Sequence, residues 1–301
     1  MPTATAKSPA LAWRLELPRG GELELRSPPR VMGVLNLTPD SFSDGGKWLE
    51  PDRAVERARE MIAEGADIID LGAESTRPGG GVYGEGAAAV PPGKQLARLL
   101  PVLEALRTET EIPISVDTRS GEVADSVLAA GADIINDVSA VRDERLARAV
   151  AASGCPLILM HSRGELGSMQ VGIHFDDLLG EVARDLADAI ARAEALGVER
   201  RQIIVDPGIG FGKTQRQNLA LLADLHHLAT LERPVLVGAS RKSFIAKVID
   251  APPDRRLGGS LAAAAWAAAR SAAIVRVHDV AETVQFLAVW GAISETAGSE
   301  R

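Results

Sequence analysis

Short apolar runs rich in Val and Ile recur eight times along the chain, and a segment of helical length follows each run. The runs cover residues 30–38, 67–75, 113–118, 133–139, 156–161, 202–208, 234–240 and 273–279. Near-continuous apolar strands are typical of a parallel sheet covered by helices on both faces. Eight strand–helix units therefore predict an α/β fold, a TIM (β/α)8 barrel, which typically uses about 250 residues. A doubly wound open sheet is the alternative.

A different pattern precedes the first of these units. Residues 11–27 alternate apolar and polar positions and break at Gly20 and Gly21, which predicts a β-hairpin covering the bottom of the barrel. No internal linker divides the chain further. We therefore expect an N-terminal segment with the hairpin over residues 1–29, a barrel domain over residues 30–295 and a short tail over residues 296–301.

Composition narrows the possible partners. The net charge of −8 argues against a nucleic-acid or anionic-membrane binder. No segment has the length and apolar character of a membrane span, and the N-terminal residues lack the apolar core of a signal peptide. The single cysteine, Cys155, precedes an apolar strand, which indicates a buried packing thiol rather than a disulfide or a thiolate zinc site. We expect a cytoplasmic protein.

Polar side chains close all eight predicted strands. They are Asn36, Asp70 with Glu74, Asp117, Asn136, His161, Asp206, Ser240 with Arg241 and Lys242, and Arg276 with His278. In a (β/α)8 barrel these strand ends form the active-site face, although any single one could be a helix cap or a solvated loop start. Carboxylate and amide groups suit a flat, donor-rich heterocycle, and the cationic groups suit an anion. One ligand with both parts would fit.

The anion would lie at the last strand. Arg276 and His278 are two residues apart, so their side chains point the same way, and barrels often hold phosphate near strands 7 and 8. A diphosphate is plausible. The alternative is that Arg276 pairs with a neighbouring carboxylate such as Asp279.

Two segments have the composition of loops that close over an active site. Residues 36–46 and 74–93 are rich in Gly, Pro and Ser, and they follow the first and second predicted strands. Long loops at this face commonly act as lids. Thr76 and Arg77 are among the groups that such a lid would bring to a ligand.

Residues 206–214, DPGIGFGKT, look like a phosphate-binding loop but fit neither template. A Walker A loop would need glycine where Pro207 stands. A dinucleotide fingerprint would need its third glycine where Lys213 stands. The glycines instead indicate a sharp turn or a close approach of the backbone to a ligand.

Together these residues resemble the dihydropteroate synthase family. The motifs NLTPDSFSDGG, DLGAESTRPG, SVDTR, INDVSA, LMH, DPGIGFGK, SRKS and RVHD stand in the family's order, and the resemblance runs from about Val31 to Asp279. It implies a TIM-barrel transferase of folate biosynthesis. The implied reaction condenses a dihydropterin methyl diphosphate with 4-aminobenzoate and releases dihydropteroate and diphosphate.

The resemblance also implies roles for single residues. Asn36 would bind Mg²⁺, and Arg276 and His278 would hold the diphosphate. The pterin pocket would be lined by Asp117, Asn136, Met160, Asp206, Phe211 and Lys242. The aminobenzoate site would be shaped by Thr76, Arg77, Pro78 and Ser243. Arg77, Lys242, Arg276 and His278 would carry the catalytic step. Members of this family are commonly homodimers through late helices, and the Ala-rich residues 258–272 could serve that contact.

Some features depart from the family pattern or stay open. The loop after Thr76 is several residues longer than usual and adds Tyr83 and Glu85. Asp70 could contact the ligand or serve a structural hydrogen bond. Two other functions share the pterin residues: a pterin-binding methyltransferase domain and a non-catalytic pterin-binding paralogue. The motifs STRPG, SRKS and RVHD favour the synthase.

Overall fold

The computed structural model describes residues 12–38, 51–74, 90–164 and 169–299. Over these residues the chain alternates strands and helices as the sequence predicted. The strands that form the main sheet are β3 (Arg30–Asn36), β4 (Ile68–Gly72), β5 (Ile114–Asp117), β6 (Ile134–Asp137), β7 (Leu157–Met160), β8 (Ile203–Asp206), β9 (Leu236–Val237) and β10 (Ile274–Val277). The helices are α1 (Pro51–Ala63), α2 (Pro92–Arg107), α3 (Gly121–Ala129), α4 (Glu144–Ser153), α5 (Leu178–Ala195), α6 (Gln215–Ala223), α7 (Ser243–Ile249), α8 (Leu257–Ala268) and α9 (Val280–Ser299).

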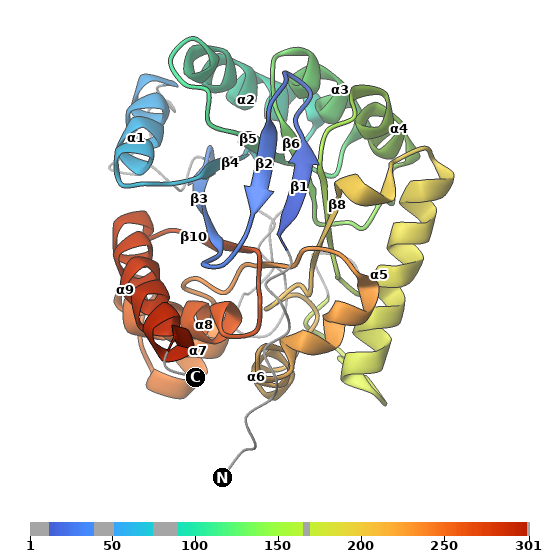
Figure 1. The fold of residues 1–301 in the computed structure, drawn as a ribbon. Helices are drawn as coiled ribbons and strands as arrows, with labels where there is room; N and C mark the ends of the chain where they lie inside the picture. Colours follow the sequence, from blue (N-terminus) through green and yellow to red (C-terminus); the bar gives the residue numbers. More distant parts are fainter. Residues whose placement is uncertain (1–11, 39–50, 75–89, 165–168, 300–301) are drawn as a thin grey trace.

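The eight strands form one parallel sheet in the order β8-β7-β6-β5-β4-β3-β10-β9. Its two edges meet through a parallel bridge between Val205 and Val235, so the sheet curls into a barrel. The helices form a ring around it (Figure 1). The predicted (β/α)8 barrel is confirmed, and the open-sheet alternative is wrong.

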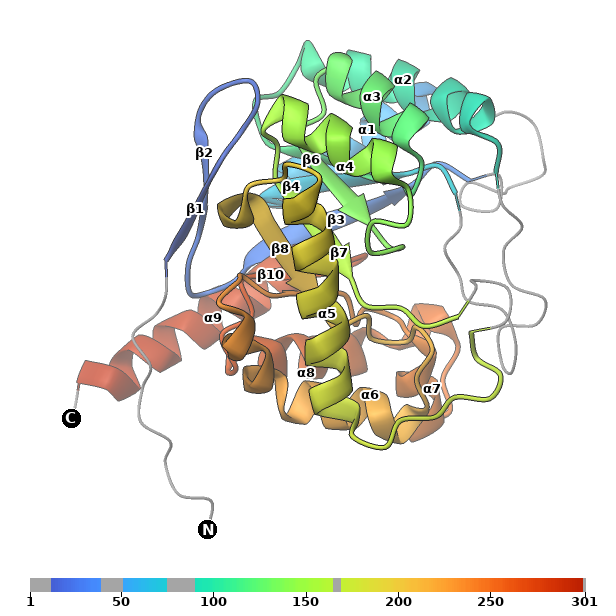
Figure 2. The same cartoon turned by 90° about the vertical axis from the view of Figure 1, so that its right-hand side faces the viewer.

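The predicted hairpin is also present. Strands β1 (Trp13–Glu16) and β2 (Glu22–Leu25) pair antiparallel, and they lie across one end of the barrel (Figures 1 and 2). Three leucines of the hairpin, Leu15, Leu23 and Leu25, pack against the apolar residues that begin the barrel strands. The hairpin therefore closes the N-terminal end of the barrel, and the strand arrows in Figure 2 run away from it toward the opposite mouth.

The chain departs from one helix per strand near its end. Both α7 and α8 lie between β9 and β10. Asp250 ends α7 in the left-handed region, with φ of 47°, and Pro252 and Pro253 follow it. Because proline cannot continue a helix, the segment starts again as a second helix.

Alternation along the strands decides what faces the inside of the barrel. On β6, Ile134 packs in the apolar floor beneath the hairpin, whereas Ile135 packs in the outer core with the helices. Successive side chains of a strand point to opposite faces. Asn136 therefore points inward above Ile134, and Asp137 points outward. The same step of two residues above the apolar floor places the polar groups of the candidate site.

Candidate functional site

A polar layer lies directly above the apolar floor of the barrel. The floor residues Ile68, Ile134, Ile158, Ile204, Leu236 and Ile274 are each followed two positions later by Asp70, Asn136, Met160, Asp206, Gly238 and Arg276. Side chains two apart on a strand share a face. The predicted residues of five strands are therefore brought together inside the mouth of the barrel, and Asp117 of β5 joins them by accepting from Arg276. We call Asp70, Asp117, Asn136, Asp206 and Arg276 the inner ring.

Arg276 is held at the centre of the inner ring by two carboxylates. Its Nε donates to Asp70 Oδ2 at 2.6 Å, and its Nη2 donates to Asp117 Oδ2 at 3.1 Å. Asp279 pairs instead with Arg241. The expected alternative partner for Arg276 is therefore wrong. Burial opposes the charge of Arg276, but Asp70 and Asp117 together raise its pKa.

The carboxylates of the inner ring keep oxygen atoms for a ligand. Asp70 Oδ1 and Asp117 Oδ1 are buried without a hydrogen-bond partner among the described residues. Burial raises the pKa of Asp117 to about 7, against the opposing effect of Arg276. Buried polar atoms are normally paired, so unpaired acceptors at a barrel mouth mark a place for a donor-bearing ligand. Asp70 also accepts from Asn136 Nδ2 at 3.4 Å, which gives it a structural role.

The glycine loop after β8 closes one side of the ring. Asp206 Oδ1 accepts from the backbone N–H of Gly208 at 2.7 Å. Gly208, Gly210 and Gly212 have φ of 66°, 87° and 59°, in the left-handed region that favours glycine. Burial raises the pKa of Asp206, while Lys242 opposes that effect.

Lys242 reaches into the same loop. Its Nζ donates to the carbonyl of Ile209 and lies 4.4 Å from the centre of the Phe211 ring. Burial lowers the pKa of Lys242 to about 8, although Asp206 favours its charge. The lysine therefore joins the glycine loop to the inner ring, as a cation over an aromatic face.

Met160 and Phe211, which the resemblance assigns to the pterin pocket, belong to an apolar wall beside the inner ring. Met160 and Phe211 pack in one buried cluster with Val138 and Met169. This cluster lies beside the polar ring because Met160 is directly paired with Asp206 across β7 and β8. A flat polar heterocycle needs both surfaces: hydrogen-bonding groups at its edge and apolar groups against its face.

His278 lies just past the end of β10. Its backbone N–H donates to Ser240 Oγ at 3.2 Å, and its Nδ1 lies 3.1 Å from the same oxygen. Burial and then Arg276 lower the pKa of His278 to about 4. The imidazole is therefore neutral near pH 7, so it meets an anion as a hydrogen-bond donor rather than as a second cation.

Asn36 is the predicted metal ligand at the end of β3. A Cβ atom at Gly72 would lie 3.5 Å from Asn36 Oδ1 and 3.8 Å from Asp117 Cβ, so the glycine leaves these side chains close together at the mouth. Mg²⁺ prefers oxygen ligands and keeps several waters. The amide oxygen of Asn36, which borders Gly72 from one side as Asp117 does from the other, is a ligand of the preferred kind. Among the described residues no group of three His, Cys, Asp or Glu side chains could hold a metal ion alone.

The predicted aminobenzoate residues are only partly described. Thr76, Arg77 and Pro78 lie outside the described residues, as do Tyr83 and Glu85. Ser243 is the first residue of α7 and directly follows Lys242. Of the predicted aminobenzoate residues, the structure therefore describes Ser243 alone.

A cavity of about 460 Å³ opens beside the apolar wall. Val138 and Met169 of that wall line it, together with the ion pair between Glu74 and Arg119. The cavity lies beside the inner ring and does not include any of its five members. The candidate site is therefore the inner ring itself, and the cavity is a neighbouring space.

Sequence reasoning gave no role to a buried group behind the glycine loop. Lys213, His161 and Asp185 are joined by hydrogen bonds there. Lys213 was visible in the sequence as the last residue of DPGIGFGK, and His161 as the end of β7. Asp185 carried no local signal, because it lies on α5 and meets His161 only in the folded chain.

Comparison with known proteins gives consistent matches. The family model described as pterin binding enzyme matches residues 32–278. The dihydropteroate synthase of Escherichia coli (strain K12) is 45% identical over 271 residues, which cover 90% of this chain and 93% of that protein. The synthase of Synechocystis sp. is 46% identical over 265 residues, 87% of this chain and 89% of that protein.

Solved structures agree. The Xanthomonas albilineans dihydropteroate synthase with 4-aminobenzoic acid is similar with a TM-score of 0.86 and 44% identity, covering 94% of this chain and 99% of that one. The same enzyme in complex with 7,8-dihydropteroate gives a TM-score of 0.82 and 42% identity, with 93% and 98% covered. Over the part of the chain that the structure describes, no helix has the length and apolar character needed to span a membrane.

Proposed function

This chain belongs to the dihydropteroate synthases among the pterin binding enzymes, and from that premise we propose how its residues carry out the reaction. The chain is a transferase that condenses (7,8-dihydropterin-6-yl)methyl diphosphate with 4-aminobenzoate. The carbon–oxygen bond to diphosphate breaks and a carbon–nitrogen bond to the aniline forms. The aniline nitrogen loses a proton, and 7,8-dihydropteroate and diphosphate leave. The single observation that carries the residue assignment is the inner ring, which presents carboxylates, an amide and a guanidinium in one mouth.

The acceptors of the ring recognise the pterin. Asp206, Asp117 and Asn136 face the space where a donor-rich aminopyrimidine edge would lie, and Asp117 Oδ1 has no other described partner. Met160 and Phe211 supply the apolar surface for the ring face. Lys242, over the Phe211 ring, supplies a donor at the rim of the same pocket. This division follows from the ligand's own surfaces, a polar edge and a flat face.

The leaving group is stabilised at the other side of the ring. Arg276 contributes a permanent cation, and neutral His278 contributes a hydrogen-bond donor. Asn36 would hold Mg²⁺ together with the diphosphate oxygens. When bound, Mg²⁺ neutralises charge on the departing diphosphate. Charge stabilisation of this kind acts where negative charge develops, so it lowers the barrier to breaking the carbon–oxygen bond.

The second substrate enters beside the first. Thr76, Arg77 and Pro78, with Ser243, are the proposed contacts of 4-aminobenzoate, and Arg77 suits its carboxylate. Water would capture an electron-poor pterin methylene, so these groups must close the site before the bond breaks. An aniline is a weak base that needs little activation, and we assign no general base.

We propose a homodimer through the last helices. Of the seven exposed large apolar side chains among the described residues, five lie on α7, α8 and α9: Val248, Ile249, Trp266, Val289 and Ile293. Helices α8 and α9 pack against each other, so Trp266, Val289 and Ile293 lie on neighbouring helices. Grouped exposed apolar side chains mark association surfaces.

We propose that the enzyme works in the cytoplasm. Its only cysteine, Cys155, is a buried free thiol, and burial raises its pKa to about 11. A fold that uses no disulfide fits a reducing compartment.

Diphosphate release tests the function. The protein is incubated with the dihydropterin methyl diphosphate and Mg²⁺, with and without 4-aminobenzoate, and dihydropteroate is detected in parallel. Release that requires 4-aminobenzoate and matches the product in amount supports the synthase. Pterin binding without turnover would support a non-catalytic paralogue. Methyl transfer to a corrinoid without diphosphate chemistry would support the methyltransferase alternative.

A further inference from the structure

Lys213 is buried behind the glycine loop, with 3% of its surface exposed. Its Nζ lies 2.9 Å from His161 Nδ1, 3.0 Å from the carbonyl oxygen of Gly208 and 2.9 Å from that of Phe211. A lysine ammonium has three hydrogens to donate and accepts nothing. Its three hydrogens therefore meet three acceptors, and two of these acceptors are carbonyls of the glycine loop itself.

This arrangement fixes the state of His161. Nε2 of His161 lies 3.0 Å from Asp185 Oδ2, and a carboxylate can only accept, so the ring proton of His161 is on Nε2. Nδ1 therefore accepts from Lys213. Burial and then Lys213 lower the pKa of His161 to about 4, which keeps the ring neutral. The hydrogen-bonded series therefore runs from Asp185 through His161 and Lys213 to the glycine loop.

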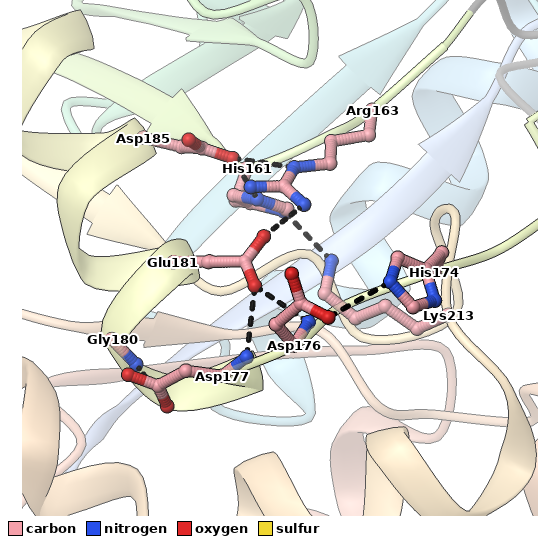
Figure 3. Close-up of polar contacts among 9 residues, drawn as sticks. All are labelled: His161, Arg163, His174, Asp176, Asp177, Gly180, Glu181, Asp185 and Lys213. Atoms are coloured by element: carbon pink, nitrogen blue, oxygen red, sulfur yellow. Dashed lines mark hydrogen bonds and ion pairs between the residues drawn. The ribbon is translucent and has the colours of Figure 1, made fainter.

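This hydrogen-bonded series is anchored to α5 (Figure 3). Arg163 donates from Nε to Asp185 at 2.7 Å and from Nη1 to Glu181 at 2.6 Å. Glu181 in turn accepts from the backbone N–H of Asp176 and Asp177, just before the helix begins. The position of Lys213 is therefore set by a network that joins the start of α5 to the loop after β7.

Lys213 restrains the glycine loop from behind, on the side away from the proposed pterin pocket. Its two carbonyl acceptors, Gly208 and Phe211, enclose the turn in which the N–H of Phe211 donates to the carbonyl of Gly208 at 3.1 Å. The same turn carries the Gly208 N–H bound by Asp206. These four hydrogen bonds therefore fix the backbone that carries the Phe211 side chain and the N–H group that orients Asp206.

We propose that Lys213 is a positioning residue for the pterin: backed by His161 and Asp185, it holds the glycine loop so that Phe211 and Asp206 meet the ligand. It contacts no substrate and acts only through these two residues. The inference rests on the proposed function, because it assigns the loop to the pterin rather than to the diphosphate. Its consequence is selective: recognition of the ring depends on Lys213, and recognition of the anion at Arg276 does not.

The test separates the two halves of the substrate. Lys213→Met keeps an unbranched side chain, one atom shorter, and removes all three donors, and Lys94→Met on the exposed surface of α2 is the matched control. Binding is measured by calorimetry with two probes, 6-hydroxymethyl-7,8-dihydropterin and Mg²⁺ with inorganic diphosphate. We expect Lys213→Met to weaken the pterin about tenfold or more and to leave diphosphate affinity within about twofold. The control leaves both affinities at the wild-type values.

Steady-state kinetics give a second readout. In Lys213→Met the KM for the pterin diphosphate should rise, while the KM for 4-aminobenzoate stays within about twofold. Pterin affinity unchanged from the wild type would overturn the inference. Equal loss of pterin and diphosphate affinity would also overturn it, because that pattern indicates general damage to the barrel.

A milder variant covers the case in which Lys213→Met does not fold. Asp185→Asn leaves Lys213 and His161 in place and removes the charge behind them, at a side chain that is 37% exposed. We expect a pterin affinity weakened about threefold to fivefold, with diphosphate affinity unchanged. No change in pterin affinity would contradict the proposal. Wild-type protein that binds neither probe would count against the proposed function itself, so the two failures are distinguishable.

Discussion

Arg276 and Asp70 are 206 positions apart in the sequence, and the Nε of the arginine donates to Oδ2 of the aspartate at 2.6 Å inside the barrel. The pair joins the last strand to the second strand of the barrel. It explains how a cation can lie in a buried ring before any anion binds, because Asp70 and Asp117 together compensate its charge. A diphosphate would find the guanidinium already oriented, which lowers the cost of ordering it on binding.

Removal of Arg276 should damage both binding and stability. Arg276→Ala leaves Asp70 and Asp117 as buried carboxylates without their cation. We expect the free energy of unfolding to fall by about 3–5 kcal/mol, and pterin diphosphate affinity to fall at least about a hundredfold. Urea denaturation and calorimetry measure the two effects.

A double variant separates these effects. Asp70→Asn combined with Arg276→Met removes the buried cation together with one carboxylate, so stability should recover most of the loss. Diphosphate affinity should stay as low as in Arg276→Ala. Recovery of diphosphate affinity along with stability would show that Arg276 is structural and that the anion binds elsewhere.

The proposed role of Asp206 as a hydrogen-bond acceptor for the pterin can be tested against a second buried aspartate, Asp137. Asp206→Asn replaces a carboxylate oxygen with an amide donor that faces the N–H groups of the pterin. We expect pterin affinity to fall about tenfold to a hundredfold. Asp137→Asn is the control, since Asp137 is also buried at a strand end but faces outward and accepts from the backbone of Ser139 and Val141. The control should lose stability and keep pterin affinity, as measured by calorimetry.

Two glycines with the same backbone conformation should respond differently to alanine. Gly208 has φ of 66° and Gly154 has φ of 69°. A Cβ atom at Gly208 would overlap the carbonyl of His161, whereas one at Gly154 would meet nothing within 4 Å. Gly154→Ala should cost about 1 kcal/mol of left-handed strain and leave activity unchanged. Gly208→Ala should displace the loop and reduce turnover at least about tenfold. Equal effects on turnover would contradict a tightly packed loop.

Stability should depend on pH through Lys213. Burial lowers its pKa from 10.5 to about 7, whereas the unfolded chain keeps the ordinary value. Between these two values the unfolded state binds more protons than the folded state, so stability rises with pH. The stability of the wild type relative to Lys213→Met should therefore increase from about pH 7 to about pH 9, by up to roughly 1 kcal/mol per pH unit. Urea denaturation of both proteins measures it, and a difference that stays flat or falls would contradict the assigned shift.

The oligomeric state tests the apolar face of the last helices. Ile293 on α9 is 65% exposed, and Ile293→Lys would place a charge in the proposed interface. We expect a dimer in the wild type and a monomer in the variant by sedimentation velocity. Val171→Lys is the control, because Val171 is 70% exposed and lies outside α7, α8 and α9. A monomeric wild type would rule out the proposed dimer.

The sequence predicted the barrel because its signal is local. Each strand is a short apolar run that ends in a polar residue such as Asn136, and both features can be seen without knowing the partners. The hairpin was predictable for the same reason, since Leu15, Leu23 and Leu25 alternate with charged residues. Periodicity of this kind can be read from one sequence alone.

What the sequence could not give were contacts made across the barrel. The sequence offered the nearby Asp279 as the alternative partner of Arg276, but Asp279 pairs with Arg241, and Asp70 and Asp117 pair with Arg276. Long-range pairs depend on the register of the closed sheet, which no local pattern specifies.

The hydrogen-bond network behind the glycine loop could not be predicted for the same reason. Lys213, His161 and Asp185 come from three separate segments, and only the folded chain makes them neighbours. The predicted roles of Thr76, Arg77 and Pro78 stay predictions, as do the expected domain limits.

The most direct test of the central claim is a crystal structure with the dihydropterin methyl diphosphate and Mg²⁺ bound. We expect the aminopyrimidine edge within about 3 Å of the Asp206 carboxylate and the diphosphate within about 3 Å of the Arg276 guanidinium, with the Asn36 amide oxygen on the metal. A pterin bound outside the inner ring, for instance in the cavity that Glu74 and Arg119 line, would contradict it.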